Sequence, residues 1–241
     1  MENKLWCFVS MALIAAGSVT TSYAKDDGKT PIQFIPVKDV QINDAFWTPK
    51  FNRWNSVTVP DVFNKFEGKH LKTAEEQNNN NIFMDFDEVA AGRKGTGHSA
   101  GLPWFNGLVY ETIRGVSDLL IQHPDKKLED RIDKYITRIE AAQKIDSNGF
   151  IDTYTDLVQP EYRWGENGGF LRWQHNVYNA GMLIEAGVHY YEATGKVKLL
   201  EVAVRLANYM CDLMGPAPKK NIIPSHSGPE EAVIKLYWLF K

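Results

Sequence analysis

Cysteine is scarce in this sequence, which holds only two among 241 residues. Cys7 falls in an N-terminal apolar run and Cys211 in a stretch of helical periodicity, where a lone cysteine is usually a small buried side chain. No Cys-x-x-Cys motif occurs, and no cysteines and histidines stand at the spacing of a zinc site. We therefore expect neither an internal disulfide nor a metal site within this chain.

An excess of basic charge is also lacking, since 27 Lys and Arg residues face 30 Asp and Glu residues, for a net charge of −3. Lys and Arg do not gather in blocks or stripes, so a nucleic-acid partner is not expected. The aromatic content of 12% suits either a core rich in aromatic rings or the stacking of such rings on sugars.

A long apolar run is missing as well, because the run from Leu5 to Gly17 is too short to cross a bilayer. Small residues ending at Ala24 follow this run, and the charged Lys25-Asp26-Asp27 comes next. This pattern predicts a secretory signal peptide over residues 1–24, with cleavage after Ala24. We expect a secreted or periplasmic protein that is not held by a membrane after cleavage.

Several familiar catalytic motifs are absent too. The sequence has no Gly-x-Ser-x-Gly elbow and no His-Glu-x-x-His zinc motif. The glycine-rich segment 90–101 lacks the Gly-Lys-Ser/Thr order and the preceding strand of a phosphate loop. We interpret this segment as a flexible loop at the mouth of the fold.

Helical periodicity dominates the second part of the sequence. Apolar residues recur at helical spacing in the segments 101–123, 126–145, 175–195, 197–215 and 229–241. Short and long links alternate between these helices, which is typical of helical hairpins stacked in a solenoid or closed into an α/α toroid. We therefore predict an all-α fold.

The region before these helices carries mixed signals. Residues 36–42 alternate apolar and polar side chains as a short strand does, whereas Pro60 fits the first turn of a helix. Residues 69–81 are polar and end in an asparagine run, so we expect a loop there. We divide the chain after its signal peptide into an extended segment over 25–56 and a helical domain over 57–241.

The sequence stops within an amphipathic helix that has no cap and no polar tail, and its apolar face needs a partner. A closed toroid of six hairpins takes about twelve helices of ordinary length, and about six are predicted here. We interpret the chain as the N-terminal half of a longer protein. A complete small helical domain with an edge helix is the alternative.

Three histidines are candidates for a site. His175 and His189 fall near one face of the predicted helix 175–195, away from its apolar face, which is compatible with lining a cavity. Taken alone, His175 is better explained as a residue that caps a turn, and His189 as a surface residue. His226 precedes the last helix, where it could reach a cleft or stay solvated.

Acidic side chains offer a second possibility. Asp152 and Asp156 follow a glycine turn and could form a carboxylate pair, although such aspartates more often bind nearby backbone N–H groups. Glu230 and Glu231 lie in the first turn of the last predicted helix, where negative charge suits the helix dipole without a catalytic role.

Several segments, in the same order over residues 38–241, resemble one protein family. They are NDAFWTPKFNRWNSVTVPDVF, EAAQKIDSNGFIDTY, HNVYNAGMLIEAGVHYYEATGKVKLLEVAVRLANYM and HSGPEEAVIKLY. The family they resemble is the β-L-arabinofuranosidase-like proteins of glycoside hydrolase family 127. The chain departs from the family pattern at His175-Asn176, where His-Glu is usual, and at Asn106-Gly107-Leu108, where Asp-Ser-Asp is usual.

The resemblance implies an (α/α)6 barrel, present here as an incomplete N-terminal portion, and retaining hydrolysis of β-L-arabinofuranosides from plant glycans. It implies that His175 and His226 bind substrate, since neutral imidazoles suit hydrogen bonds to sugar hydroxyls. It also implies a cysteine nucleophile beside a zinc bound by cysteines and a glutamate, with a separate glutamate as acid/base. These residues belong to the second half of the family's barrel, and Cys211 lies on the wrong helix for the nucleophile. Zinc is thus expected in the full-length family, with no ligands in this chain.

Three hypotheses follow, each with a glycan or oligosaccharide as the partner. The first is a glycoside hydrolase present as its N-terminal half, which we expect to be inactive in isolation because the pocket is incomplete. The second is a carboxylate-pair glycosidase of another specificity on the same toroid, with Asp152 and Glu230 as candidates. The third is a non-catalytic helical module that binds glycans.

Overall fold

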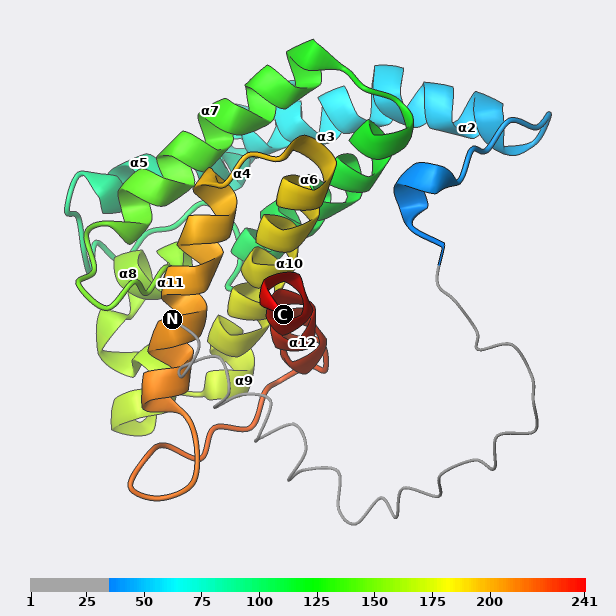
Figure 1. The fold of residues 1–241 in the computed structure, drawn as a ribbon. Helices are drawn as coiled ribbons and strands as arrows, with labels where there is room; N and C mark the ends of the chain where they lie inside the picture. Colours follow the sequence, from blue (N-terminus) through cyan, green and yellow to red (C-terminus); the bar gives the residue numbers. More distant parts are fainter. Residues whose placement is uncertain (1–34) are drawn as a thin grey trace, which may run out of the picture.

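A computed structural model describes residues 35–241, so the predicted signal peptide over 1–24 lies outside the described residues. Within the described range the chain is helical apart from its loops and one isolated parallel bridge between Met214 and Lys220 (Figure 1). The all-α prediction is therefore confirmed for this range. None of the helices in residues 35–241 combines the length and the apolar character needed to cross a bilayer.

The strand predicted over residues 36–42 is wrong. The 3-10 turn η1 (Val37–Asp39) forms instead, with the N–H groups of Asp39 and Val40 donating to the carbonyls of Pro36 and Val37 at 2.9 and 3.1 Å. The residues of this turn are exposed, and no neighbouring strand is described that could pair with them. Alternation of residue types alone does not form a strand without such a partner.

A continuous helical rod follows η1. It consists of α2 (Trp47–Arg53), the π-helical stretch η2 (Trp54–Thr58) and α3 (Val59–Phe66), and Pro60 lies in the first turn of α3 as predicted. The rod begins where the Asp44 carboxylate accepts hydrogen bonds from the backbone N–H groups after it. The extended conformation predicted for 25–56 is therefore wrong from Trp47 onward.

The loop predicted over residues 69–81 is also wrong in part, because residues 74–80 form the helix α4 (Ala74–Asn80). A capping box starts this helix: the Glu76 N–H donates to Thr73 Oγ1 at 3.0 Å, and the Thr73 N–H donates to Glu76 Oε2 at 3.2 Å. These two reciprocal bonds satisfy backbone donors at the helix start and outweigh the low helix propensity of asparagine. Helix α5 (Ile82–Ala90) follows directly.

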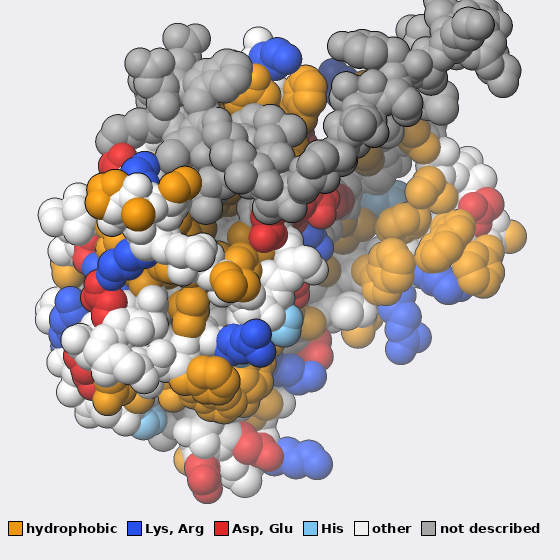
Figure 2. Space-filling view, turned by 90° about the horizontal axis from the view of Figure 1, so that it is seen from below, with side chains coloured by type: hydrophobic (Ala, Val, Ile, Leu, Met, Phe, Trp, Pro, Cys, Tyr) orange, Lys and Arg blue, Asp and Glu red, His pale blue; other side chains and the backbone are white. Residues whose placement is uncertain are grey.

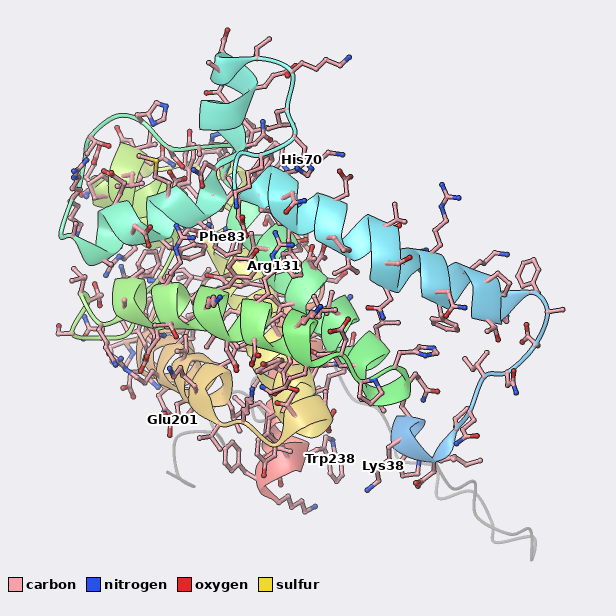
Figure 3. The ribbon with its side chains drawn as sticks, turned by 90° about the horizontal axis from the view of Figure 1, so that it is seen from above. Lys38, His70, Phe83, Arg131, Glu201 and Trp238 are labelled. Carbon is pink, nitrogen blue, oxygen red and sulfur yellow. The ribbon has the colours of Figure 1, made fainter. Side chains whose placement is uncertain are left out.

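The remaining long helices match their predictions. They are α6 (Phe105–Gln122), α7 (Lys126–Gln143), α10 (Asn176–Thr194), α11 (Lys198–Leu213) and α12 (Pro229–Phe240). Helix α7 packs against α5 and α11, so these three lie side by side in one layer (Figure 3). Helix α10 packs against three helices, α6, α11 and α12. It is therefore the central helix of the fold.

Aromatic rings fill much of the core. Phe83 of α5 and Tyr135 of α7 stack with ring centroids 3.9 Å apart, and Phe63 of α3 packs 5.0 Å from the same tyrosine. Arg131 of α7 donates from Nη2 to Asn64 Oδ1 at 2.7 Å, which ties α3 to α7 at the edge of this core (Figure 3). The helical rod is thereby joined to the main body of the fold.

The long connection between α7 and α10 is itself partly helical. It contains α8 (Thr153–Val158), the 3-10 segment η3 (Pro160–Gly168) and the four-residue helix α9 (Leu171–Gln174). These short elements lie near the start of α10, at the lower end of the molecule in Figure 1. They place polar side chains from the connection against the first turns of α10.

Candidate functional site

His175 occupies a special backbone position at the junction of α9 and α10. It caps the end of α9, starts α10 and adopts the left-handed conformation, with φ of 57° and ψ of 14°. Its carbonyl accepts a hydrogen bond from the Asn179 N–H at 2.8 Å. Residues other than glycine rarely adopt this conformation, and where they do the surrounding structure must hold them there.

A buried polar network supplies that support. The Asp152 carboxylate accepts hydrogen bonds through Oδ2 from the side-chain amides of Asn176 and Asn179, at 3.0 and 2.8 Å. Its Oδ1 accepts from the Thr155 N–H at 2.9 Å, which caps α8. All four side chains are buried. The network thus locks the start of α10, and with it His175, against α8.

The network also decides between the two roles considered for Asp152. Its carboxylate is 1% exposed, and both oxygens are occupied by neighbouring donors. Burial raises its pKa above the ordinary value, although the hydrogen bonds from Thr155, Asn179 and Asn176 act in the opposite direction. The predicted capping role is confirmed. Because the carboxylate does not reach the surface, it is not placed to act on a substrate.

The structure brings together the two histidines that the resemblance singled out. His226, in the loop before α12, lies with its Nε2 atom 3.2 Å from the Nε2 atom of His175. The two residues are separated by 51 positions in the sequence. Their pairing therefore depends on how α12 packs against α10.

The neighbouring contacts fix which atom of the pair carries a hydrogen. His175 Nδ1 lies 2.6 Å from the carbonyl oxygen of Trp173. A carbonyl only accepts, so Nδ1 carries the hydrogen and Nε2 of neutral His175 is an acceptor. His226 must then donate from its own Nε2. The donor of His226 and the acceptor of His175 are therefore bonded to each other, and neutral His226 has its Nδ1 left as a second acceptor.

Aromatic side chains wall the pair. The ring centroid of Trp104 lies 5.2 Å from that of His175, and the ring of Tyr178 lies 5.3 Å from that of His226. Together with Ser227 these residues line an open pocket of about 470 Å³. Figure 2 views the molecule from below, the side at which α9 lies in Figure 1, and shows hydrophobic side chains interspersed with polar ones and with histidine.

Tyr178 is held by a further bond, since its hydroxyl donates to Glu111 Oε1 of α6 at 2.9 Å. Burial, together with this bond, raises its pKa to about 12. Sequence reasoning missed both aromatic residues. Tyr178 follows His175 by three positions and so shares its helix face, which was an available signal. Trp104 comes from a distant segment of the sequence, so no sequence signal pointed to its place beside His175.

The other candidates lie apart from the pocket. His189 follows His175 by 14 residues, which is about 20 Å along α10. The surface position predicted for it is wrong, because it is half-buried with Nδ1 2.6 Å from Asp118 Oδ1. Cys211 is 3% exposed in α11, as predicted.

The remaining acidic candidates make contacts of a structural kind. They are Asp156, Glu230 and Glu231. Burial raises the pKa of Asp156 to about 6, although Arg163 at 3.6 Å opposes this shift. Glu230 and Glu231 lie in the first turn of α12, as predicted. Glu230 accepts a hydrogen bond from the Gly228 N–H at 3.3 Å.

The glycine-rich segment 90–101 is tied to the fold by hydrogen bonds. The N–H groups of Gly95 and Gly97 each donate to carbonyls of α8 at 2.9 Å. The Asp85 carboxylate accepts from the Ala100 N–H at 3.0 and 2.9 Å. The segment therefore runs along α8 and leads to Trp104, one wall of the pocket.

Over the described range 35–241, no group of three or more His, Cys, Asp or Glu side chains is arranged to hold a metal ion. The zinc implied by the family resemblance therefore has no ligand set among these residues.

Comparison with known families gives this geometry its context. The family model of the β-L-arabinofuranosidase catalytic domain, GH127, matches residues 39–239. The chain belongs to glycoside hydrolase family 127. Its helices accordingly form part of an (α/α)6 barrel, as the sequence predicted.

Individual family 127 relatives agree with this assignment. A non-reducing end β-L-arabinofuranosidase of Bifidobacterium longum subsp. longum is 29% identical over 138 residues, covering 57% of this chain and 21% of the relative. The solved β-L-arabinofuranosidase of Geobacillus stearothermophilus T6 gives a TM-score of 0.71 at 26% identity, covering 83% of this chain and 30% of that structure. The β-arabinofuranosidase BT3674 gives 0.71 at 29% identity, covering 85% and 31%. The chain thus spans less than a third of the length of these relatives.

Proposed function

We propose that this chain carries part of the sugar-binding pocket of a glycoside hydrolase that releases L-arabinofuranose from β-L-arabinofuranosides of plant glycans. Hydrolysis would proceed with retention of configuration, outside the cytoplasm. The reacting groups would come from the parts of the relatives that this chain does not match. Membership in family 127 and the arrangement of the histidine pocket support this proposal.

The observation that carries the proposal is the His175–His226 pair. A sugar hydroxyl both donates and accepts, so it can replace the direct 3.2 Å hydrogen bond of the pair by donating to His175 Nε2 and accepting from His226 Nε2. The buried network behind His175 holds the backbone of this residue in place before a ligand arrives. Preorganised polar groups of this kind lose little entropy on binding, which favours a small neutral ligand.

A non-catalytic glycan-binding module is the second candidate. The same pocket favours it, because its lining of aromatic rings, imidazoles and a hydroxyl suits sugar binding without a carboxylate pair, and Asp152 is sealed from solvent. Because Asp152 is buried, it is also not a suitable member of the carboxylate pair in the alternative glycosidase. Binding without turnover in a chain as long as the relatives would favour the module over the hydrolase.

Calorimetric titration with methyl β-L-arabinofuranoside tests the site. We expect saturable binding by the chain and about five- to tenfold weaker binding by His226→Ala, because one hydrogen bond is worth roughly 1 kcal/mol. His175→Asn should weaken binding similarly, since asparagine tolerates the left-handed conformation but does not extend to the Nε2 position.

His98→Ala is the matched control, because His98 is exposed and does not line the pocket. Its affinity should equal that of the wild type. Absence of saturable binding by the wild type, or unchanged affinity in both pocket variants, would contradict the proposal.

A further inference from the structure

A second aromatic surface adjoins the histidine pocket. The ring of Trp173 in α9 lies edge to face with that of Trp104, at a centroid distance of 5.7 Å and an angle of 89°. Trp104 lines the pocket, whereas Trp173 lies next to it and is 43% exposed. Tryptophan is highly buried on average, so an indole left open beside a pocket is available to cover part of a ligand.

The position of Trp173 is fixed by its neighbours along the chain. Gln174 is buried, and its side-chain amide donates to the Tyr162 carbonyl. The Trp173 carbonyl accepts from His175 Nδ1 at 2.6 Å. The backbone that carries the indole is therefore tied to the imidazole, so the two side chains keep a defined relation.

The side chains around this surface also define the kind of ligand. The five residues lining the pocket carry no fixed charge: Trp104, His175, Tyr178, His226 and Ser227. Such a lining does not favour a phosphate or a carboxylate. Aromatic faces combined with imidazole and hydroxyl groups suit a neutral carbohydrate, whose rings have apolar C–H faces and polar edges.

We propose that Trp104 and Trp173 form a subsite for a second sugar ring, so that the ligand is a disaccharide or a longer glycan. This inference rests on the proposed function, in which the histidine pair holds the first ring. The second ring lies with its C–H face on the exposed indole of Trp173. Trp104 contacts both rings, because it borders the pocket on one side and Trp173 on the other.

The size of the effect follows from the area covered. A sugar ring that covers roughly 55 Å² of apolar indole surface gains about tenfold in affinity, at about 25 cal/mol per Å². We therefore expect a disaccharide to bind about tenfold more tightly than the methyl glycoside of the single sugar. Trp173→Ala should remove this advantage, and Trp173→Phe should keep part of it.

Titration of the chain with methyl β-L-arabinofuranoside and with the β-(1→2)-, β-(1→3)- and β-(1→5)-linked L-arabinofuranosyl disaccharides tests the subsite. At least one disaccharide should bind about tenfold more tightly than the monosaccharide. In Trp173→Ala its affinity should fall to the monosaccharide level, while monosaccharide affinity stays unchanged.

Trp238→Ala is the control, because Trp238 is also an exposed indole, at 63%, but lies nine residues beyond the start of α12 (Figure 3). It should leave all affinities unchanged. If monosaccharide binding depends on the histidines but no disaccharide binds more tightly, the second subsite is wrong and the proposed function stands. Equal loss of mono- and disaccharide affinity in Trp173→Ala would also overturn the subsite. Absence of all binding would overturn both proposals.

Discussion

Two carboxylates at the residue scale show how surroundings set the pKa in opposite directions. Burial tends to raise the pKa of Glu67, but hydrogen bonds from Lys69, Tyr135 and Arg131 outweigh it and lower the pKa to about 2. Burial also raises the pKa of Asp85, and there it prevails, to about 6. The two pKa values differ because cationic side chains pair with Glu67, whereas Asp85 accepts hydrogen bonds only from a backbone N–H and a hydroxyl.

Asp85 therefore makes stability depend on pH. Its pKa rises from 3.8 to about 6 on folding, so the folded chain binds this proton more tightly than the unfolded chain. The resulting stabilisation is fully present below pH 3.8 and is lost as the pH rises through 6. We expect the free energy of unfolding of the wild type to fall by about 3 kcal/mol relative to Asp85→Asn between pH 3.5 and 7.

Urea unfolding at several pH values measures this difference. Asp87→Asn on the same helix is the control for loss of a carboxylate that is not buried, because the Asp87 side chain is 57% exposed and pairs with Arg138. Parallel curves for Asp85→Asn and wild type would show that Asp85 does not titrate as described.

At the scale of elements, the position of α10 depends on two glycines. A Cβ atom at Gly181 would lie 2.8 Å from the Pro229 Cα atom of α12, and one at Gly187 would lie 2.7 Å from the Ala203 Cβ atom of α11. Both helices can approach α10 closely only because these side chains are absent. The approach of α12 also sets the place of His226, which lies three residues before Pro229.

Gly181→Ala should consequently destabilise the fold by about 1–3 kcal/mol, as overpacking does, and weaken binding of methyl β-L-arabinofuranoside by displacing His226. Gly115→Ala in α6 is the matched change, because no atom beyond its chain neighbours and the adjoining backbone of its own helix lies within 4 Å of its Cβ position. It should stabilise the chain by about 0.5–1 kcal/mol, since alanine favours helix. Thermal unfolding and calorimetry measure both effects. Equal stability of the two variants would contradict the packing explanation.

For the whole molecule, polar contacts join α10 to α6 and α12 in addition to apolar packing. Glu185 of α10 is 1% exposed and pairs with Arg114 of α6 and, at 3.1 Å, with Lys235 of α12. Part of α12 faces outward, with Ile234, Trp238 and Phe240 exposed at 38%, 63% and 53%. The chain spans about 30% of the length of its solved relatives. In the proposed function, the pocket is therefore one part of a larger site.

We expect the isolated chain to release no arabinose from an aryl β-L-arabinofuranoside, because the reacting groups are proposed to lie outside it. The assay follows the released aryl alcohol, with the Bifidobacterium enzyme as the positive control. Turnover by the isolated chain that is lost in His175→Asn would contradict the proposed division of the site.

Local signals in the sequence determined the helices and several of their ends. The periodicity of α6, α7, α10 and α11, the proline in α3 and the capping aspartate Asp152 act within a few residues, so the sequence alone predicts them. The order of the resembling segments also predicted the family. The capping box of α4 was equally local and readable, but the asparagine run obscured it.

Tertiary packing decided the site. His175 and His226 could each be singled out from the sequence, but their contact across 51 residues depends on the approach of α12 to α10. Trp104 joins them only because α6 packs on α10. The raised pKa of Asp85 likewise requires burial, which periodicity does not report. Helix formation depends on neighbours in the chain, whereas a pocket depends on neighbours in space.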